Sequence, residues 1–269
     1  NRQSSTIFNC TSNGALLHPY VDSKGNMGRQ YSRDMQYAAA RYTEVKLEKI
    51  CEEIFRDLDK NAVDFIDNYD GTLKEPALLP ATFPSVLVNA NQGIAVGMAS
   101  NICSFNLREI CDAAVAYIND ENEDLMKYIK APDFSTGGEL VYNENEMRGI
   151  YETGRGGFKV RARYRYDKQN SCIEVTEIPY TTTSEAIIDS AIELIKSGKM
   201  KDITDVRDET DLDGLKITFD IKKSADPDAI MNKLFRFTAL QDSFNCNFNI
   251  LVDGTPRVMG IRTILKEWL

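Results

Sequence analysis

The chain contains 269 residues, of which 42% are hydrophobic and 27% charged, and its formal net charge is −9. This mix is typical of a soluble globular protein with one large domain or two ordinary ones. An acidic chain is not, on average, a nucleic-acid-binding protein. The single histidine, His18, excludes a histidine-rich metal site. Six irregularly spaced cysteines without a CxxC pair favour free thiols in a reducing cytosol over a disulfide framework or a zinc site.

In the first part of the chain, the sequence pattern predicts loops and two helices. Residues 1–34 are rich in Ser, Asn and Gly, which favours loops and short strands. Apolar side chains within residues 47–58 recur at helical spacing and predict one amphipathic helix. Three prolines within residues 67–85 predict an irregular connector, and Asn106 is a candidate cap for a helix that follows it.

The second part predicts strands that alternate with helices, so the fold class is α+β. Residues 160–166 alternate apolar and basic side chains and predict one strand, and residues 172–178 predict the next. Thr182 and Glu185 have the spacing of a capping box, which predicts a helix from there. Further signals predict a strand at 215–221, a helix after Asp226-Pro227, a hairpin at Asp253-Gly254 and a helix at 261–269.

Basic residues are concentrated in one segment of this acidic chain. Residues 155–168 contain six Lys or Arg against one Asp. On one strand, Lys159, Arg161, Arg163 and Arg165 project from one face at intervals of about 6.6–6.8 Å. Such a row suits a polyanion backbone. The alternative is a solvent-facing row whose counter-charges lie on the next strand, with Glu174 as a candidate.

Three short motifs are better explained by turns than by ligand binding. Asp67 and Asp70 resemble paired carboxylates, but the Asp-Gly context favours turn-forming side chains. The DLDG sequence at 211–214 lacks the ligand pattern of a calcium loop. NQGIAVGM, from residue 91, lacks the GK[ST] ending of a phosphate-binding loop, so its glycines favour a tight turn.

A set of longer strings resembles a known family in order and spacing. These strings are AAARYTEVKL (38–47), VDFIDNYDGTLKEPALLPATFP (63–84), NQGIAVGMASNICSFNLREI (91–110), GRGGFKVRARYRYD (154–167), EIPY (177–180) and RDETDLDGLKITFDI (207–221). Together they resemble the A subunit of bacterial type IIA DNA topoisomerases, which are DNA gyrase and topoisomerase IV. The resemblance extends over nearly the whole chain.

The resemblance implies two domains. Residues 1–90 correspond to the rear part of a winged-helix DNA-breakage domain, and residues 91–269 to an α+β tower domain that ends where the exit-gate helix begins. The chain then corresponds to an internal piece of the whole polypeptide. In the family, a histidine often regarded as the general base lies in a motif that His18, in LLHPY, does not match.

The resemblance assigns the chemistry to two neighbouring residues. Tyr42 matches the tyrosine that attacks the DNA backbone, which forms a 5′-phosphotyrosine and frees a 3′-hydroxyl, and Arg41 matches the catalytic arginine beside it. A phenol with an ordinary pKa of about 10 is a weak nucleophile at neutral pH, so the reaction needs a base or a metal-polarised phosphate. A guanidinium stabilises charge on the phosphoryl oxygens in the transition state.

The resemblance also implies DNA contacts. Ile94 matches an isoleucine that enters the duplex between base pairs, and the alternative is a core isoleucine in a turn. Arg161, Arg163 and Arg165 match the tower surface that bent DNA approaches. Arg29 and Arg33 lie in the loop that leads to the tyrosine and are candidate phosphate contacts.

The family further implies partners and cofactors. The partners are double-stranded DNA, a B subunit and a second A subunit. Mg²⁺ and ATP are held by the B subunit, and we expect this chain to bind neither, to be cytoplasmic without a membrane partner, and to be inactive in cleavage by itself. Two alternatives remain open: a non-catalytic DNA-binding scaffold related to the tower, and a nucleotide- or phosphate-binding enzyme that uses the glycine-containing loops.

Overall fold

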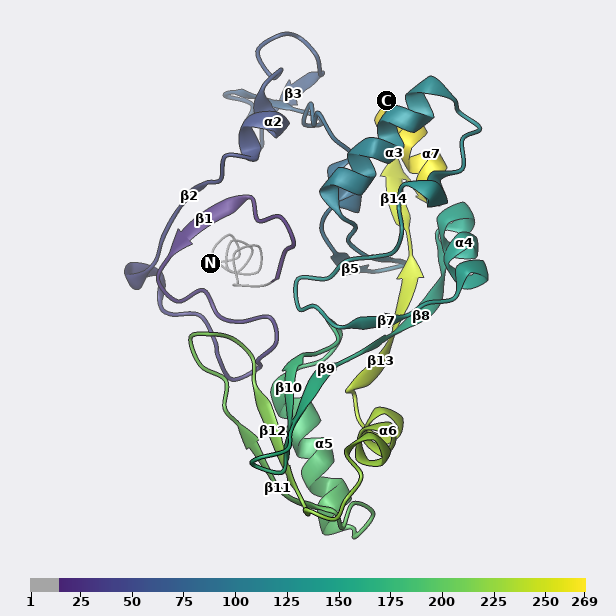
Figure 1. Cartoon of the computed structure of the whole chain (residues 1–269). Helices are drawn as coiled ribbons and strands as arrows, with labels where there is room; N and C mark the ends of the chain where they lie inside the picture. Colours follow the sequence, from purple (N-terminus) through teal and green to yellow (C-terminus); the bar gives the residue numbers. More distant parts are fainter. Residues whose placement is uncertain (1–14) are drawn as a thin grey trace.

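The computed structural model describes residues 15–269, so the loops and short strands expected within residues 1–14 lie outside the described part. Figure 1 shows two regions stacked along the long axis of the molecule. The upper region is built on a five-stranded sheet and the lower region on a four-stranded sheet, each with its own hydrophobic core. This mixture of antiparallel sheets and separate helices is an α+β arrangement, as the sequence predicts.

The upper sheet is antiparallel throughout and has the strand order β5-β6-β13-β8-β7. Helices α3, α4 and α7 bury apolar side chains in the core beside this sheet. The elements are β5 (Asn91–Ala95), β6 (Met98–Ile102), α3 (Leu107–Asn119), β7 (Glu139–Val141), α4 (Glu144–Thr153), β8 (Arg155–Arg161), β13 (Gln241–Asn247), β14 (Asn249–Val252), β15 (Thr255–Val258) and α7 (Ile261–Trp268).

The lower sheet is also antiparallel, with the order β11-β12-β10-β9. Helices α5 and α6 both contribute buried side chains to the core of this region. The elements are β9 (Arg163–Asp167), β10 (Cys172–Glu177), α5 (Ser184–Lys196), β11 (Ile203–Asp208), β12 (Ile217–Ile221) and α6 (Pro227–Phe237).

The first part of the chain forms small two-stranded sheets rather than a large domain of its own. Strand β1 pairs with β2, and β3 pairs with β4. The elements of this first part are β1 (Val21–Lys24), β2 (Glu44–Leu47), α2 (Cys51–Phe55), β3 (Phe65–Asp67) and β4 (Lys74–Pro76), with 3₁₀ turns at Ala40–Tyr42 and Ser85–Leu87. A third 3₁₀ turn, Leu125–Lys127, follows α3 in the upper region.

Several sequence predictions are confirmed at the element boundaries. The Asn106 side chain accepts hydrogen bonds from the N–H groups of Arg108 and Glu109 and caps α3. Asp226 caps α6 with Pro227 directly after it. Asp253 and Gly254 both have positive φ, 50° and 74°, between the paired strands β14 and β15. Local side-chain chemistry determines these boundaries, so the sequence is sufficient to find them.

The predicted helix over 47–58 is wrong in its extent. Only Cys51–Phe55 is helical, and Leu47 is a strand residue paired with Val21. The N–H of Glu48 donates to the carbonyl oxygen of Tyr20, which continues the strand pairing. Strand partners contributed by an earlier segment therefore override the helical spacing of the apolar residues.

The single strand predicted over 160–166 is also wrong. The chain crosses from the upper to the lower sheet at Ala162, which is buried and donates its N–H to the carbonyl oxygen of Leu240. Lys159 and Arg161 consequently belong to β8, whereas Arg163 and Arg165 belong to β9 of the other sheet. The four cations do not form one continuous row.

Free thiols are confirmed for the five cysteines among residues 15–269. None of the helices in this range is long and apolar enough to cross a membrane.

Candidate nucleic-acid interface

Tyr42 lies at the end of a long connection between two paired strands. Residues 25–43 join β1 to β2, and the 3₁₀ turn that carries Arg41 and Tyr42 comes just before β2. Tyr42 is 66% exposed, so this residue lies on the surface of the described structure. The Arg41 guanidinium carbon lies 4.8 Å from the centre of the Tyr42 ring. The two candidate catalytic residues are thus side by side on an open surface.

Backbone contacts hold this turn in place at both ends of the connection. The N–H of Tyr42 donates to the carbonyl oxygen of Ala39 at 2.9 Å. The N–H of Ala38 donates to the carbonyl oxygen of Asn26, also at 2.9 Å. Gly25 has a φ of +94°, and a Cβ atom there would lie 2.5 Å from the carbonyl oxygen of Tyr42. Only glycine allows this approach, so Gly25 determines where the peptide of Tyr42 lies.

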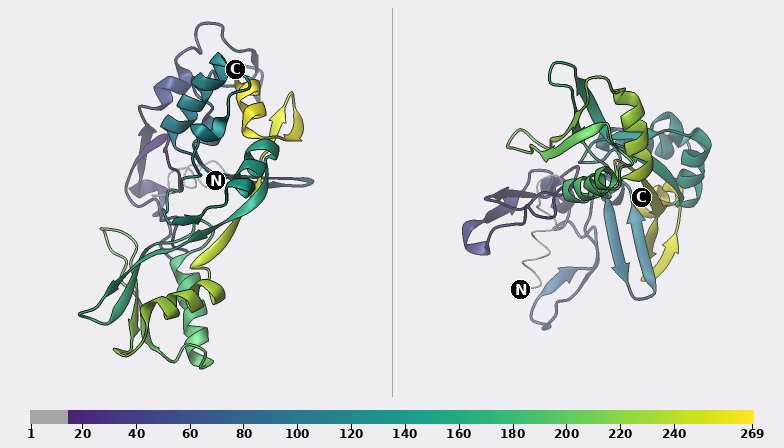
Figure 2. Two further views of the ribbon diagram at one scale, coloured as in Figure 1. Left: turned by 45° about the vertical axis from the view of Figure 1, so that its right-hand side comes forward. Right: turned by 90° about the horizontal axis from the view of Figure 1, so that it is seen from below.

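Ile94 lies on a two-stranded projection. Strands β5 and β6 form a hairpin that extends away from the rest of the molecule (Figure 2). Ile94 is 86% exposed there, so the alternative of a core isoleucine is wrong. Gly97 has a φ of +77° at the turn. The hairpin is not followed directly by a helix, so it does not offer the helix N-terminus of a phosphate-binding loop.

The three candidate arginines of β8 and β9 have partners of their own. Arg165 forms an ion pair with Glu174, the candidate counter-charge on the neighbouring strand. Arg163 pairs with Glu177 at 3.4 Å. Arg161 donates to the side chain of Gln241 at 2.6 Å.

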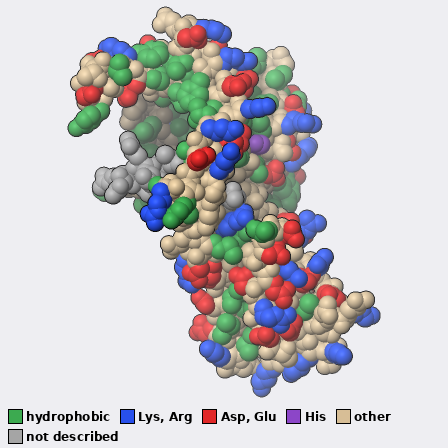
Figure 3. All heavy atoms as spheres, turned by 90° about the vertical axis from the view of Figure 1, so that its left-hand side faces the viewer, with side chains coloured by type: hydrophobic (Ala, Val, Ile, Leu, Met, Phe, Trp, Pro, Cys, Tyr) green, Lys and Arg blue, Asp and Glu red, His purple; other side chains and the backbone are tan. Residues whose placement is uncertain are grey.

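These partners leave the arginine side chains of β9 partly open. The side chains of Arg163 and Arg165 remain 63% and 73% exposed. Figure 3 shows basic and acidic side chains interspersed over the lower region rather than a surface of one sign. Binding of a polyanion here has to proceed next to paired carboxylates.

The loop arginines differ in setting. Arg33 is 62% exposed, with Asp34 at 3.3 Å and Asp189 of α5 at 3.9 Å from its guanidinium nitrogens. Arg29 is half-buried, and its N–H donates to the carbonyl oxygen of Met35. Both residues therefore belong to the connection that ends at Tyr42.

His18 has a structural setting in the upper region. Its backbone N–H and carbonyl form a pair of 2.8 Å hydrogen bonds with the side chain of Asn89. Burial lowers the pKa of its imidazole, which favours the neutral form.

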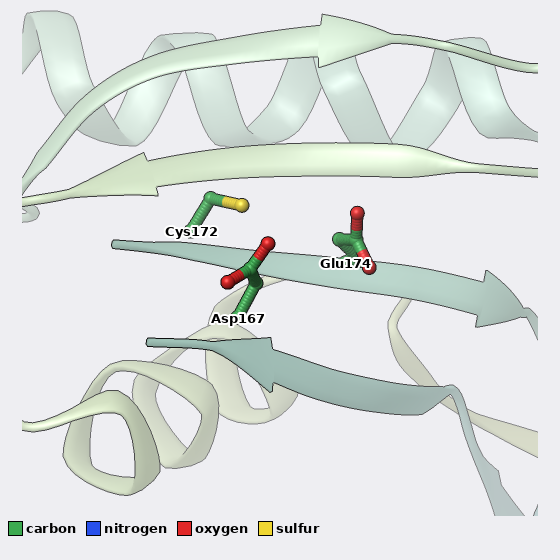
Figure 4. A group of neighbouring side chains, drawn as sticks. All are labelled: Asp167, Cys172 and Glu174. Carbon is green, nitrogen blue, oxygen red and sulfur yellow. The ribbon is translucent and has the colours of Figure 1, made fainter. Parts of the chain in front are cut away.

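One group of potential metal ligands occurs among the described residues, and it does not suit Mg²⁺. Figure 4 shows Asp167, Cys172 and Glu174 together on neighbouring strands. Hydrogen bonds from Lys216 and Arg165 lower the pKa of Glu174, so two cations already neutralise this carboxylate. Burial raises the pKa of the Cys172 thiol, which opposes the thiolate that a metal needs, and Mg²⁺ prefers oxygen ligands.

Of the remaining carboxylates, Asp70 and Asp211 form turns, as predicted, whereas the prediction is wrong for Asp67, which is the last residue of strand β3 and pairs across to β4. Asp70 accepts hydrogen bonds from Thr72, Asp67 pairs with Lys74, and Asp211 accepts from the N–H of Asp213.

Sequence reasoning misses one residue that the fold brings to the candidate site. The spacing predicts that Glu185 closes a capping box with Thr182, but Thr183 caps α5 and Glu185 instead accepts hydrogen bonds from residues 32–34. The spacing locates the start of the helix to within one residue. No local pattern relates Glu185 to a loop 150 residues earlier.

Comparison with known proteins shows which family the chain belongs to. Residues 4–269 match the family described as the A subunit of DNA gyrase/topoisomerase IV. The chain is 42% identical over 261 residues to the DNA gyrase A subunit of Borreliella burgdorferi, covering 95% of this chain and 32% of that protein. It is 42% identical to the DNA gyrase A subunit of Clostridium acetobutylicum, covering 94% of this chain and 31% of that protein. It is 39% identical to that of Ureaplasma parvum, covering 98% of this chain and 32% of that protein. The chain spans about a third of the length of these relatives, and it belongs to the family of DNA gyrase/topoisomerase IV A subunits.

Proposed function

We propose that this chain supplies the DNA-cleaving nucleophile of a type II DNA topoisomerase, with Tyr42 as that nucleophile. The observation that carries the proposal is the exposed Tyr42 ring with the Arg41 guanidinium 4.8 Å away, in the segment that matches the family. Family membership supports the isomerase class. The residue assignment is our own.

The proposed reaction is a transesterification at a backbone phosphorus. The Tyr42 oxygen attacks the phosphorus, the bond to the 3′ oxygen breaks, and the phenolic proton is transferred, by way of a base, to the departing 3′ oxygen. Arg41 stabilises the charge on the non-bridging oxygens as the five-coordinate state forms. The bond energy is retained in the phosphotyrosine, so rejoining is the same displacement in reverse.

The projecting hairpin suits the proposed wedge. An apolar side chain that enters a base step gives up little packing in the free protein if it is already exposed, as Ile94 is. Unstacking one step costs a few kcal/mol, which contacts along the bent duplex offset. We assign Arg29 and Arg33 to phosphate contacts near the nucleophile, and Arg161, Arg163 and Arg165 to contacts with the DNA arms.

The proposal includes the larger assembly. Residues 1–90 are part of the winged-helix breakage domain and residues 91–269 form the tower. A second A subunit and two B subunits complete the cytoplasmic enzyme, and the B subunits hold ATP and Mg²⁺. Mg²⁺ polarises the scissile phosphate when bound. Because cleavage needs these partners, we propose that this chain forms no covalent DNA adduct by itself.

A tyrosine substitution in a complete A subunit, assayed with its B subunit, tests the nucleophile. Tyr42→Phe removes the attacking oxygen and is expected to abolish protein-linked DNA on a denaturing gel while DNA affinity changes less than about twofold. Tyr69→Phe is the matched control, because Tyr69 is fully exposed and lies outside the proposed site. Adducts that persist in Tyr42→Phe show that another residue is the nucleophile and contradict the proposal. A wild-type enzyme without adducts also contradicts it, and favours the scaffold alternative.

A further inference from the structure

The connection that carries Tyr42 is closed at its base and extended at its tip. Its base is fixed by the pairing of Lys24 with Glu44 across β1 and β2, next to the contact between Gly25 and Tyr42. Its tip, residues 29–36, reaches the lower region of the molecule (Figure 1). The tip and the turn that carries Tyr42 therefore belong to one continuous connection.

The tip is docked on the start of helix α5 by one carboxylate. Glu185 accepts a hydrogen bond from the Ser32 hydroxyl, from the N–H of Arg33 at 2.9 Å and from the N–H of Asp34 at 3.2 Å. The same Ser32 hydroxyl oxygen accepts from the N–H of Met35 at 3.1 Å. These bonds satisfy consecutive polar groups of the tip, and bonds to an ionised carboxylate are stronger than neutral ones.

A second contact, made by Tyr31, also holds the tip against the lower region. The N–H of Ser184, in the first turn of α5, donates to the carbonyl oxygen of Tyr31 at 2.8 Å, and the Tyr31 side chain packs against the core of the lower region. Thr183 caps the helix, which leaves the Glu185 side chain available for the tip.

The carboxylate stays ionised throughout the neutral range. Partial burial acts to raise the pKa of Glu185, but hydrogen bonds from Ser32 and from the Arg33 and Asp34 N–H groups outweigh it and lower the pKa to about 2. The docking contact is therefore permanently charged at physiological pH.

We propose that Glu185 is a positioning residue for the cleavage reaction, because it ties the connection bearing Tyr42 to helix α5. This inference rests on the proposed function of Tyr42. Glu185 contacts neither DNA nor the reacting atoms in this scheme. It sets the position and rigidity of the turn from a helix that follows the nucleophile by more than 140 residues.

The docking contact is tested first in this chain, without DNA. Glu185→Ala removes all three acceptor bonds, and hydrogen exchange at the Arg33 and Asp34 amides, followed by mass spectrometry, is expected to accelerate about tenfold or more. Glu193→Ala is the matched control, because Glu193 is an exposed glutamate on the same helix. Glu185→Gln keeps an acceptor oxygen and is expected to give an intermediate rate. Unchanged exchange in Glu185→Ala, with the variant folded, overturns the inference.

The catalytic consequence is tested in a complete A subunit with its B subunit. In Glu185→Ala the single-turnover rate of adduct formation at saturating DNA is expected to fall about tenfold, with DNA affinity changed less than about twofold. Ser32→Ala is also expected to lower the rate of adduct formation. The double variant Ser32→Ala, Glu185→Ala is expected to lose less rate than the two single effects combined.

The outcomes separate the two proposals. A wild-type enzyme without adducts overturns the proposed function, and this inference with it. A wild-type enzyme that cleaves, together with a Glu185→Ala variant that cleaves equally fast, overturns the inference alone.

Discussion

At the scale of single residues, the environment of Tyr42 depends on neighbours that are not themselves reactive. Arg41 supplies charge, Gly25 supplies space for the Tyr42 carbonyl, and Glu185 holds the tip of the connection. Only Arg41 is adjacent to Tyr42 in sequence, so only that neighbour is apparent before the fold is known. A reactive residue on a loop needs such supports, because a displacement of about 1 Å can cost about a hundredfold in rate.

Gly25 offers a test that separates backbone strain from a steric collision. Gly25→Ala places a methyl group 2.5 Å from the Tyr42 carbonyl oxygen at a φ of +94°, whereas Gly71→Ala has a φ of +69° with open space around the new Cβ. We expect Gly71→Ala to lower the free energy of unfolding by about 1 kcal/mol, and Gly25→Ala to lower it further.

Thermal unfolding and adduct formation together check this prediction. Gly25→Ala should also slow adduct formation, whereas Gly71→Ala should not. Equal effects of the two substitutions on both measurements would show that the contact with Tyr42 has no special role.

At the scale of elements, side-chain patterns predict the structure where local chemistry decides it. Caps such as Asn106 and the Asp253-Gly254 turn act on their own backbone, and the alternation over 215–221 matches a buried strand face. Prediction from the sequence fails at Leu47 and at Ala162. The path of the backbone there is determined by partners distant in the chain, which are β1 for Leu47 and Leu240 for Ala162. Exposure of Ile94 likewise follows from the hairpin, since its own spacing fits a buried turn equally well.

The β5–β6 hairpin allows the proposed wedge to be changed without disturbing the core. Ile94→Ala removes a side chain that is 86% exposed, so the free energy of unfolding is expected to stay within about 0.5 kcal/mol of wild type. In the complete enzyme, the duplex should be less bent, because the apolar wedge that unstacks the base step is lost.

Energy transfer between dyes at the two ends of a bound duplex measures this bend. Val96→Ala is the matched control, because Val96 is also fully exposed and lies two residues away at the tip of the same hairpin. A bend that survives Ile94→Ala, or that Val96→Ala removes equally, is incompatible with Ile94 as the wedge.

At the scale of the whole molecule, a net charge of −9 opposes binding to DNA, so affinity must come from local cations. Composition alone argues against this function, and the match over residues 4–269 argues for it. The two are compatible because five of the six basic residues of 155–168 lie on the consecutive strands β8 and β9, while the acidic excess lies elsewhere in the sequence. Their ion pairs with Glu174 and Glu177 reduce this local charge without covering it.

Salt dependence of DNA binding measures how many of these cations replace counterions. Each phosphate contact contributes about −0.9 to the slope of log K against log salt. The triple variant Arg161→Gln, Arg163→Gln, Arg165→Gln in the complete enzyme is therefore expected to flatten that slope by about 1 to 3. The matched control removes the same net charge at exposed residues near the end of α5, as Lys196→Gln, Lys199→Gln, Lys201→Gln. If both triple variants flatten the slope equally, net charge rather than contact explains the binding, and the assignment of the three arginines fails.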